Sequence, residues 1–235
     1  MKVLYVGNVL PIVVAEKLKL SLAGKKYEIS LLESLNKKLD KNLEIISIST
    51  AGRKESKNIT NYEVFSGKSF KILISNRIPF FNDLVRNLQF FFIAFNWAIK
   101  NAKQKRIVVL LNSPLGLCST LVILKYLMNI KPVSLTIDTP FTNENIYKGL
   151  IGSYYKMSFK LGHKLLKQFS GIIVLNNEVL DTLGLKIPYH ITTIGFDESK
   201  YQFDNNYYAY IENRYSRDLK KVVYAGTLST SKGTD

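Results

Sequence analysis

Residues 107–112 read IVVLLN, and this short run decides the fold class of the 235-residue chain. An apolar segment of helical length follows at residues 115–128, and another strand-like run, PVSLTI, follows at residues 132–137. A strand that is apolar along its whole length is typical of a parallel sheet with both faces covered, because neither side of it meets water. The succession of strand, helix and strand predicts a βαβ unit at the centre of the chain.

The same alternation continues toward both ends of the chain. Further strands are expected at Lys2–Val6, Glu28–Leu32, Leu43–Ser49 and Gly171–Leu175, and further helices at residues 13–23, 82–105 and 147–168. Helix-length segments between consecutive strands favour parallel pairing, with helices on both faces of the sheet. The predicted fold class is therefore α/β, a doubly wound parallel sheet of the Rossmann-like type.

The chain is strongly basic. It carries 33 Lys and Arg against 18 Asp and Glu, a formal net charge of +15, and its first 106 residues hold 19 of the basic and 8 of the acidic residues. Such an excess indicates an anionic partner: a phospholipid surface, a phosphorylated carrier or nucleic acid. No nucleic-acid recognition motif accompanies the charge, so nucleic acid is not an expected partner.

Cysteine and histidine are too few for the usual nucleophile or metal chemistry. The single Cys118 excludes a disulfide framework and a multi-cysteine zinc site, and its apolar helical surroundings predict a core position. His163 lies among lysines in an expected helix and His190 in a strand-like run, so both are interpreted as structural residues. No Asp-x-Asp pair occurs, and we predict neither a metal site nor a cofactor.

No targeting or membrane-spanning segment is predicted. The apolar start of the chain is followed by Pro11 and by the charged Glu16-Lys17, without a small-residue cleavage site. The longest apolar run, Phe90–Ile99, is much shorter than the ~20 residues needed to cross a bilayer. We expect a cytoplasmic protein that is soluble or bound peripherally at the inner face of the plasma membrane.

Two turns hold the candidate site residues of this domain, because ligands of open α/β sheets bind at the carboxyl ends of the strands. Gly7 and Asn8 follow the first strand and are predicted to line the ligand-binding cleft. Asp138 follows PVSLTI and is the candidate catalytic residue; the alternative is an acid that caps a turn. Glu33, expected just after a strand, could be the ribose-binding acid of an NAD-type oxidoreductase, but two of the three glycines of that fingerprint are absent.

Two concentrations of basic residues could meet an anionic membrane. Lys156, Lys160 and Lys164 follow one another at steps of four, extended by Lys167, and predict a basic amphipathic helix. The aromatic segment at residues 90–97 is followed by Lys100, Lys103, Lys105 and Arg106. A solvated lysine face, and cations that favour a helix C-terminus, explain the two concentrations equally well.

The last residues of the chain resemble a known family. Val222–Ser229 reads VVYAGTLS and is followed by Lys232-Gly233, similar to the first strand and turn of the C-terminal domain of family 4 retaining glycosyltransferases, which have the GT-B fold. Gly171–Leu180 resembles the strand and helix late in that family's N-terminal domain. Ile191–Asp197 resembles the strand and Gly-x-Asp turn that lead to its interdomain linker, so the three segments occur in the family's order.

The resemblance implies metal-independent transfer of a sugar, with retention, from a nucleotide-sugar donor. A lipid-linked or polysaccharide acceptor would bind the N-terminal domain. By position, Lys232 would meet the donor diphosphate and Gly226 would let the backbone approach it, while Thr227 stands where the family often has Arg. The sequence also lacks the His that the family commonly carries near the Asp138 turn.

The resemblance also implies three parts in the chain. Residues 1–196 would form the Rossmann-like acceptor-binding domain, residues 197–219 an interdomain linker, and residues 220–235 the first strand and turn of a donor-binding domain. A chain that ends there is expected to have little transferase activity, because both walls of the cleft are needed to position the reactants. The alternative is a non-catalytic accessory or degenerate glycosyltransferase-like domain that binds a carrier or a partner subunit.

Overall fold

The computed structural model of the protein describes residues 1–17, 22–48, 65, 70–73, 79–112, 114–136, 149–175 and 177–192. All of them belong to one compact unit, Met1–Thr193. Its centre is a parallel sheet of seven strands: β1 (Lys2–Gly7), β2 (Leu43–Ser47), β3 (Lys71–Ile72), β4 (Arg106–Leu111), β5 (Lys131–Thr136), β6 (Gly171–Val174) and β7 (Tyr189–Ile191). The predicted linker at residues 197–219 and the predicted strand after it lie outside the described residues.

The strands lie in the order β3-β2-β1-β4-β5-β6-β7. The chain starts in the middle of the sheet, builds outward through β2 to β3, and returns to the other side of β1 with β4. Val3 of β1 pairs in register with Leu43 of β2 and with Ile107 of β4. This order confirms the predicted α/β fold, a doubly wound Rossmann-like sheet.

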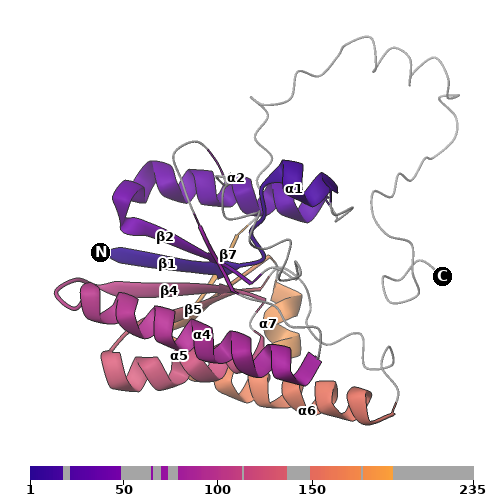
Figure 1. The fold of residues 1–235 in the computed structure, drawn as a ribbon. Helices are drawn as coiled ribbons and strands as arrows, with labels where there is room; N and C mark the ends of the chain where they lie inside the picture. The colour runs from indigo at the N-terminus through magenta and orange to yellow at the C-terminus, as the bar shows by residue number, and fades with distance from the viewer. Residues whose placement is uncertain are drawn as a thin grey trace, which may run out of the picture. The chain divides into compact units, whose positions relative to one another are not determined.

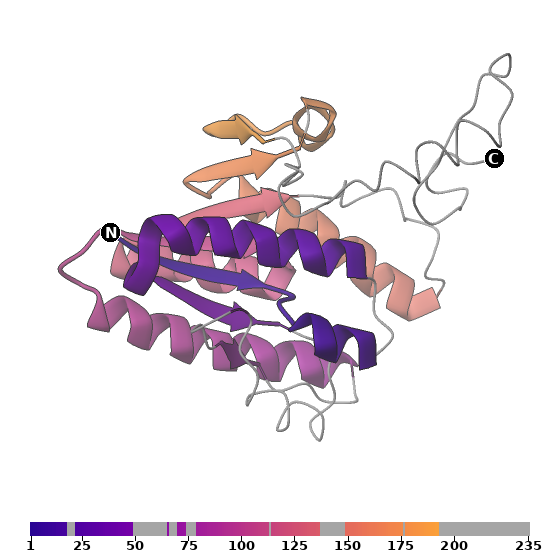
Figure 2. The same cartoon turned by 90° about the horizontal axis from the view of Figure 1, so that it is seen from above.

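Helices cover both faces of the sheet (Figures 1 and 2). On one face lie α1 (Ile12–Lys17) and α2 (Leu22–Leu39), which is followed by the 3₁₀ turn η1 (Asp40–Asn42). On the other face lie α4 (Pro79–Lys100), α5 (Leu115–Met128) and α6 (Gly149–Leu166), and α7 (Asn177–Leu183) packs against β6. This two-sided cover is why β1 and β4 can be apolar along almost their whole length.

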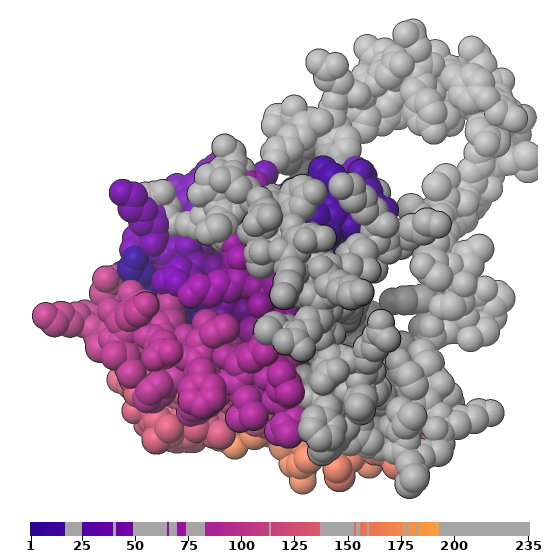
Figure 3. All heavy atoms as spheres, in the orientation of Figure 1, coloured from indigo at the N-terminus to yellow at the C-terminus, as the bar shows by residue number. Residues whose placement is uncertain are grey.

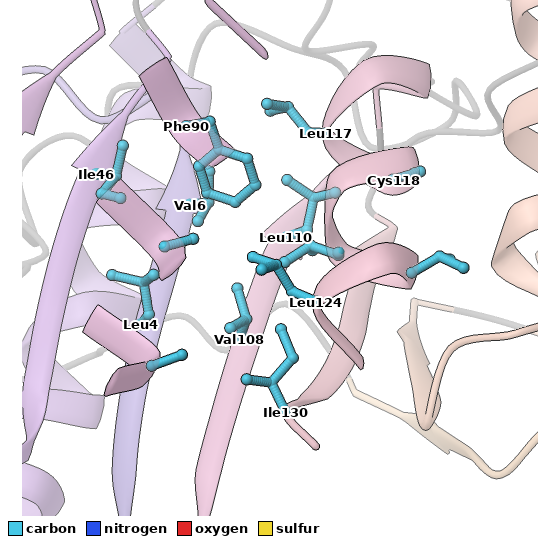
Figure 4. Close-up of a cluster of buried hydrophobic side chains, with 14 of the residues drawn as sticks. Leu4, Val6, Ile46, Phe90, Val108, Leu110, Leu117, Cys118, Leu124 and Ile130 are labelled. Atoms are coloured by element: carbon cyan, nitrogen blue, oxygen red, sulfur yellow. The ribbon is translucent and has the colours of Figure 1, made fainter. Parts of the chain in front are cut away.

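The core is divided by the sheet into two layers. Leu4 and Val6 of β1 point to the α4–α5 side, where they join Phe90, Val108, Leu110 and the α5 residues drawn in Figure 4. The alternate residues Val3 and Tyr5 point to the α1–α2 side. Phe90 is completely buried at the centre of the first layer.

Most predicted elements are confirmed, and the helix at residues 115–128 has the predicted bounds. The strand predicted at Glu28–Leu32 is wrong, because these residues lie inside α2. Ile29 and Leu32 are buried and Leu35 and Leu39 partly buried on one side of that helix, which is a helical period and not the alternation of a strand. The helix predicted at residues 13–23 is helical wherever the structure describes it, in α1 and in the start of α2; residues 18–21 lie outside the described residues.

The described helices include none that is both long enough and apolar enough to cross a membrane. The longest, α4, has Arg86 and Asp83 in its first half and ends at Lys100.

Two phenylalanines of α4 give a direct test of this packing. Replacing the buried Phe90 by Ala should lower the free energy of unfolding by about 3–5 kcal/mol, because a large cavity is left in the core. Phe92 is 60% exposed, and Phe92→Ala should change that free energy by less than about 0.5 kcal/mol. Urea unfolding followed by circular dichroism measures both, and equal effects of the two changes would contradict the described orientation of α4.

Candidate functional site

The strand order puts the topological switch point of the sheet at the carboxyl ends of β1 and β4. The connections from these neighbouring strands leave toward opposite faces of the sheet, and sheets of this type usually bind ligands in a crevice at this point. Gly7 and Asn8 lie at the end of β1, and Asn112 lies directly after β4. The two predicted cleft residues are therefore at the position where such sheets bind ligands.

The loop after β1 is fixed by hydrogen bonds on every side. The Ile48 N–H donates to the Gly7 carbonyl at 2.8 Å, and the Ser47 hydroxyl donates to the Val9 carbonyl at 2.5 Å. The Lys25 ammonium of α2 donates to the Asn8 carbonyl. Val9, Leu10 and Pro11 are buried, so this wall of the crevice is rigid before any ligand binds.

A buried carboxylate lies beneath this loop. Glu28 of α2 is only 3% exposed, and it accepts a hydrogen bond from the Tyr5 hydroxyl at 3.1 Å and another from the Asn8 backbone N–H. Burial raises the pKa of Glu28, and the Lys25 charge and these two hydrogen bonds offset only part of that rise. Burial also lowers the pKa of Lys25, against the attraction of Glu28.

Glycine is the only residue type that fits at position 7, next to this carboxylate. A Cβ atom built at position 7 would collide with the Glu28 carboxylate and would lie 2.6 Å from Cε1 of the Tyr5 ring. The Tyr5 ring is completely buried and cannot move aside. The glycine therefore serves the packing of Glu28 against β1, whatever ligand the crevice takes.

Asn8 takes part in this cluster through its main chain, and its side-chain oxygen takes no part in it. Its N–H and C=O are both used, by Glu28 and Lys25, whereas its side-chain oxygen Oδ1 is buried and has no hydrogen-bond partner in the described part of the chain. A buried acceptor without a donor is costly, so Asn8 Oδ1 is a candidate to accept a hydrogen bond from a ligand or a bound water.

The opposite wall is formed by the end of β4 and the start of α5. Asn112 has a left-handed backbone, with φ of 50°, and its N–H donates to the Leu135 carbonyl at 2.9 Å. Pro114 precedes α5, and no side chain of the described residues caps the N-terminus of that helix. Gly116 in its first turn leaves room for the Asn87 side chain of α4, with which a Cβ atom would collide.

The other predicted residues fall into three groups. Asp138, Gly226, Thr227 and Lys232 lie outside the described residues, so their roles stay predictions. Glu33 does not follow a strand but lies in the middle of α2, which removes the acid from the NAD-type alternative. Cys118 is buried in the core, His163 lies in α6 and His190 in β7, as expected.

The basic residues also separate into different roles. Arg106 donates to the carbonyls of Ala98 at 2.7 Å and Met128 at 2.5 Å, so its guanidinium binds the C-terminal ends of α4 and α5. Arg106 therefore has the structural role that was the alternative to membrane binding, a cation at a helix C-terminus. Lys156, Lys160, Lys164 and Lys167 are all exposed. Across the described ranges, no three His, Cys, Asp or Glu side chains lie close enough together to hold a metal ion.

A separate cavity of about 580 Å³ lies between α4 and the strands β1 to β3. Its charged lining residues are Lys41, Glu44, Lys71 and Lys100, and Trp97 forms part of its apolar wall. None of Gly7, Asn8 and Asn112 lines this cavity. It is therefore distinct from the crevice at the strand ends.

The buried cluster of Tyr5, Lys25 and Glu28 was not among the predicted site residues. Lys25 and Glu28 are three apart, a spacing that brings side chains together on a helix but places them on opposite sides of a strand. Because the strand prediction covered Glu28, this helical spacing was not recognised.

No protein-family model matches the chain, and no curated protein matches it.

The space above Glu28 yields a first prediction for the site. Gly7→Ala should destabilise the protein by about 1–3 kcal/mol, because the added methyl group overpacks the cluster. Combining it with Glu28→Ala should give less than the sum of the two single effects, since the second change removes one of the colliding groups. Urea unfolding of the single and double variants measures this coupling, and strict additivity would refute it.

The pKa shift of Glu28 yields a second prediction. An acid whose pKa is higher in the folded than in the unfolded protein stabilises the fold below its ordinary pKa of 4.5, and this contribution is lost as the pH rises. Relative to Glu28→Gln, the wild-type protein should therefore lose free energy of unfolding as the pH is raised above the ordinary pKa of 4.5. The exposed Glu16→Gln is the control for the loss of a surface carboxylate, and a wild-type curve parallel to that of Glu28→Gln would contradict the prediction.

Proposed function

We propose that the chain is the acceptor-binding part of a metal-independent, retaining glycosyltransferase. The reaction would move a sugar from a nucleotide-sugar donor to a lipid-linked or polysaccharide acceptor, in the cytoplasm and at the inner face of the plasma membrane. Two features support this proposal: the resemblance of the closing segment to the donor-domain start of family 4 glycosyltransferases, and the doubly wound sheet that precedes it.

The observation that carries the proposal is the pairing of a rigid loop with one unsatisfied acceptor atom. The loop after β1 is held by Ser47, Ile48 and Lys25, and within the described ranges its buried Asn8 Oδ1 has no hydrogen-bond partner. A lipid-linked sugar or a polysaccharide carries hydroxyl groups that can donate to this oxygen. An oxygen held at a fixed point on a rigid loop can orient such a hydroxyl for reaction.

The roles proposed for the other site residues rest on their positions in the sequence. Asp138 comes two residues after the end of β5, the strand next to β4, and would act on the acceptor hydroxyl or on the developing charge at the sugar. Gly226, Thr227 and Lys232 would bind the donor diphosphate from the second domain. Lys232 would neutralise diphosphate charge as a point cation, in place of a metal ion.

An assay of sugar transfer tests the proposal. The complete reading frame, translated to its stop codon, is incubated with labelled nucleotide-sugars and a membrane lipid extract, and transfer of label to lipid or polymer is measured. Asn8→Ala should reduce kcat/KM by about tenfold, the effect of one lost hydrogen bond in a site that positions a hydroxyl.

Asn36→Ala is a matched control for that variant. Asn36 of α2 is also partly exposed with a buried side-chain oxygen that lacks a partner, but it lies near the far end of α2, away from Asn8. It should leave kcat/KM within about twofold of wild type. Absence of transfer from every donor tested would favour the non-catalytic accessory domain instead.

A further inference from the structure

The outward sides of α4, α5 and α6 carry most of the exposed large apolar side chains. Within the described residues thirteen such side chains are exposed, and nine of them lie on these three helices. They are Leu84, Leu88, Phe92, Ile99, Ile123, Tyr126, Leu127, Met157 and Leu161. The opposite helices α1 and α2 expose only Val13 in their described part, so the apolar excess belongs to one face of the sheet.

On α4 these side chains form a continuous row. Leu84, Leu88 and Phe92 follow one another at steps of four, which places them above one another on the helix. Phe91 joins the row to its neighbours, with its ring 5.7 Å from that of Phe92 and 5.8 Å from that of Phe95. The atoms of α4 form the magenta surface in Figure 3.

The row continues across the neighbouring helices. α4 packs against α5 and α5 against α6. On α5 the exposed side chains Ile123 and Leu127 are four residues apart, with Tyr126 beside them. The one cation of α5, Lys125, donates to the Gln168 carbonyl after α6, so the outward side of α5 is uncharged.

The charges around this apolar surface are almost all positive. Across α4, α5 and α6 the only acid is Asp83, and it forms an ion pair of 2.6 Å with Arg86. On α6 Lys156, Lys160 and Lys164 are exposed in a row with steps of four. Met157 and Leu161 are exposed next to these lysines on the same helix.

We propose that the face formed by α4, α5 and α6 docks on an anionic phospholipid bilayer. Side chains such as Phe92 and Leu127 would enter the headgroup region, while the lysines of α6 bind the lipid phosphates. A second copy of the chain is the poorer occupant, because the only acid on these three helices, Asp83, is already paired with Arg86, so the face offers no free acid to the lysines of another copy. Docking of this face needs no sugar transfer, so it can be tested with vesicles that contain no acceptor.

Sedimentation with vesicles tests the proposal on the 235-residue chain. We expect the chain to bind phosphatidylcholine vesicles that contain about 30% phosphatidylglycerol, and added salt should weaken this binding. Binding to pure phosphatidylcholine should be at least about tenfold weaker, because a few lysines at the membrane surface contribute roughly one order of magnitude in affinity. Charge reversal of the α6 row, Lys156→Glu with Lys160→Glu and Lys164→Glu, should weaken binding at least about tenfold.

A second triple variant separates this face from net charge. Lys26, Lys37 and Lys38 are exposed on α2, on the opposite side of the sheet, and their reversal to Glu changes the net charge by the same amount. It should weaken binding less than about threefold, because those residues are far from the bilayer. Equal loss of binding in the two triple variants would overturn the proposal.

The apolar part is tested by Phe92→Ser with Leu127→Ser, matched by Val13→Ser on α1. The first pair should weaken vesicle binding about tenfold or more and the control by less than about twofold, since only the first removes inserted side chains. Thermal unfolding checks that each variant is folded. Absence of wild-type binding to anionic vesicles would overturn the proposal, as would a wild-type dimer that the paired variant converts to a monomer.

Discussion

The burial of the Glu28 carboxylate is the constraint on which the crevice depends. Taking an ionised carboxylate out of water is costly, and here the Tyr5 hydroxyl, the Asn8 N–H and the Lys25 ammonium compensate only in part. These contacts tie α2 to the end of β1 and thereby set the path of the loop that follows. They also exclude any side chain at position 7. The identity of Tyr5, Gly7 and Lys25 thus follows from one buried charge.

The sheet could be predicted from the sequence because its central strands are buried on both faces. Ile107–Asn112 and Gly171–Leu175 are uninterrupted apolar runs, and few other structures bury such a run so completely. Glu28–Leu32 misled the prediction because Ile29, Leu31 and Leu32 satisfy both a strand and a helix over so short a stretch. The longer period through Leu35 and Leu39 favours the helix, and tertiary packing on β1 decides for it.

The candidate site was predictable only as far as topology fixes it. Gly7 and Asn8 could be placed because every parallel strand ends at the same edge of the sheet, so a position after β1 is a position at the crevice. The roles of their atoms could not be predicted. Asn8 uses its main chain for Glu28 and Lys25 and leaves Oδ1 unsatisfied because α2 packs across β1. Glu28 of that helix is twenty residues further along the chain, so the sequence around Asn8 does not reveal the contact.

The inner and outer sides of α4 meet different demands, and Phe90 and Phe92 show the difference within one turn of that helix. Phe90 fills the core and is required by the fold, whereas Phe92 lies 60% exposed and adds nothing to packing beneath the helix. An exposed apolar row on α4 that continues on α5 and α6 is a patch of the kind that contacts membranes or other proteins. In the docking that we propose, this row and the lysines of α6 contact an anionic bilayer. The strand ends of β1 and β4 lie at an edge of the sheet and not on this face, so a ligand position there would remain open while the face is bound.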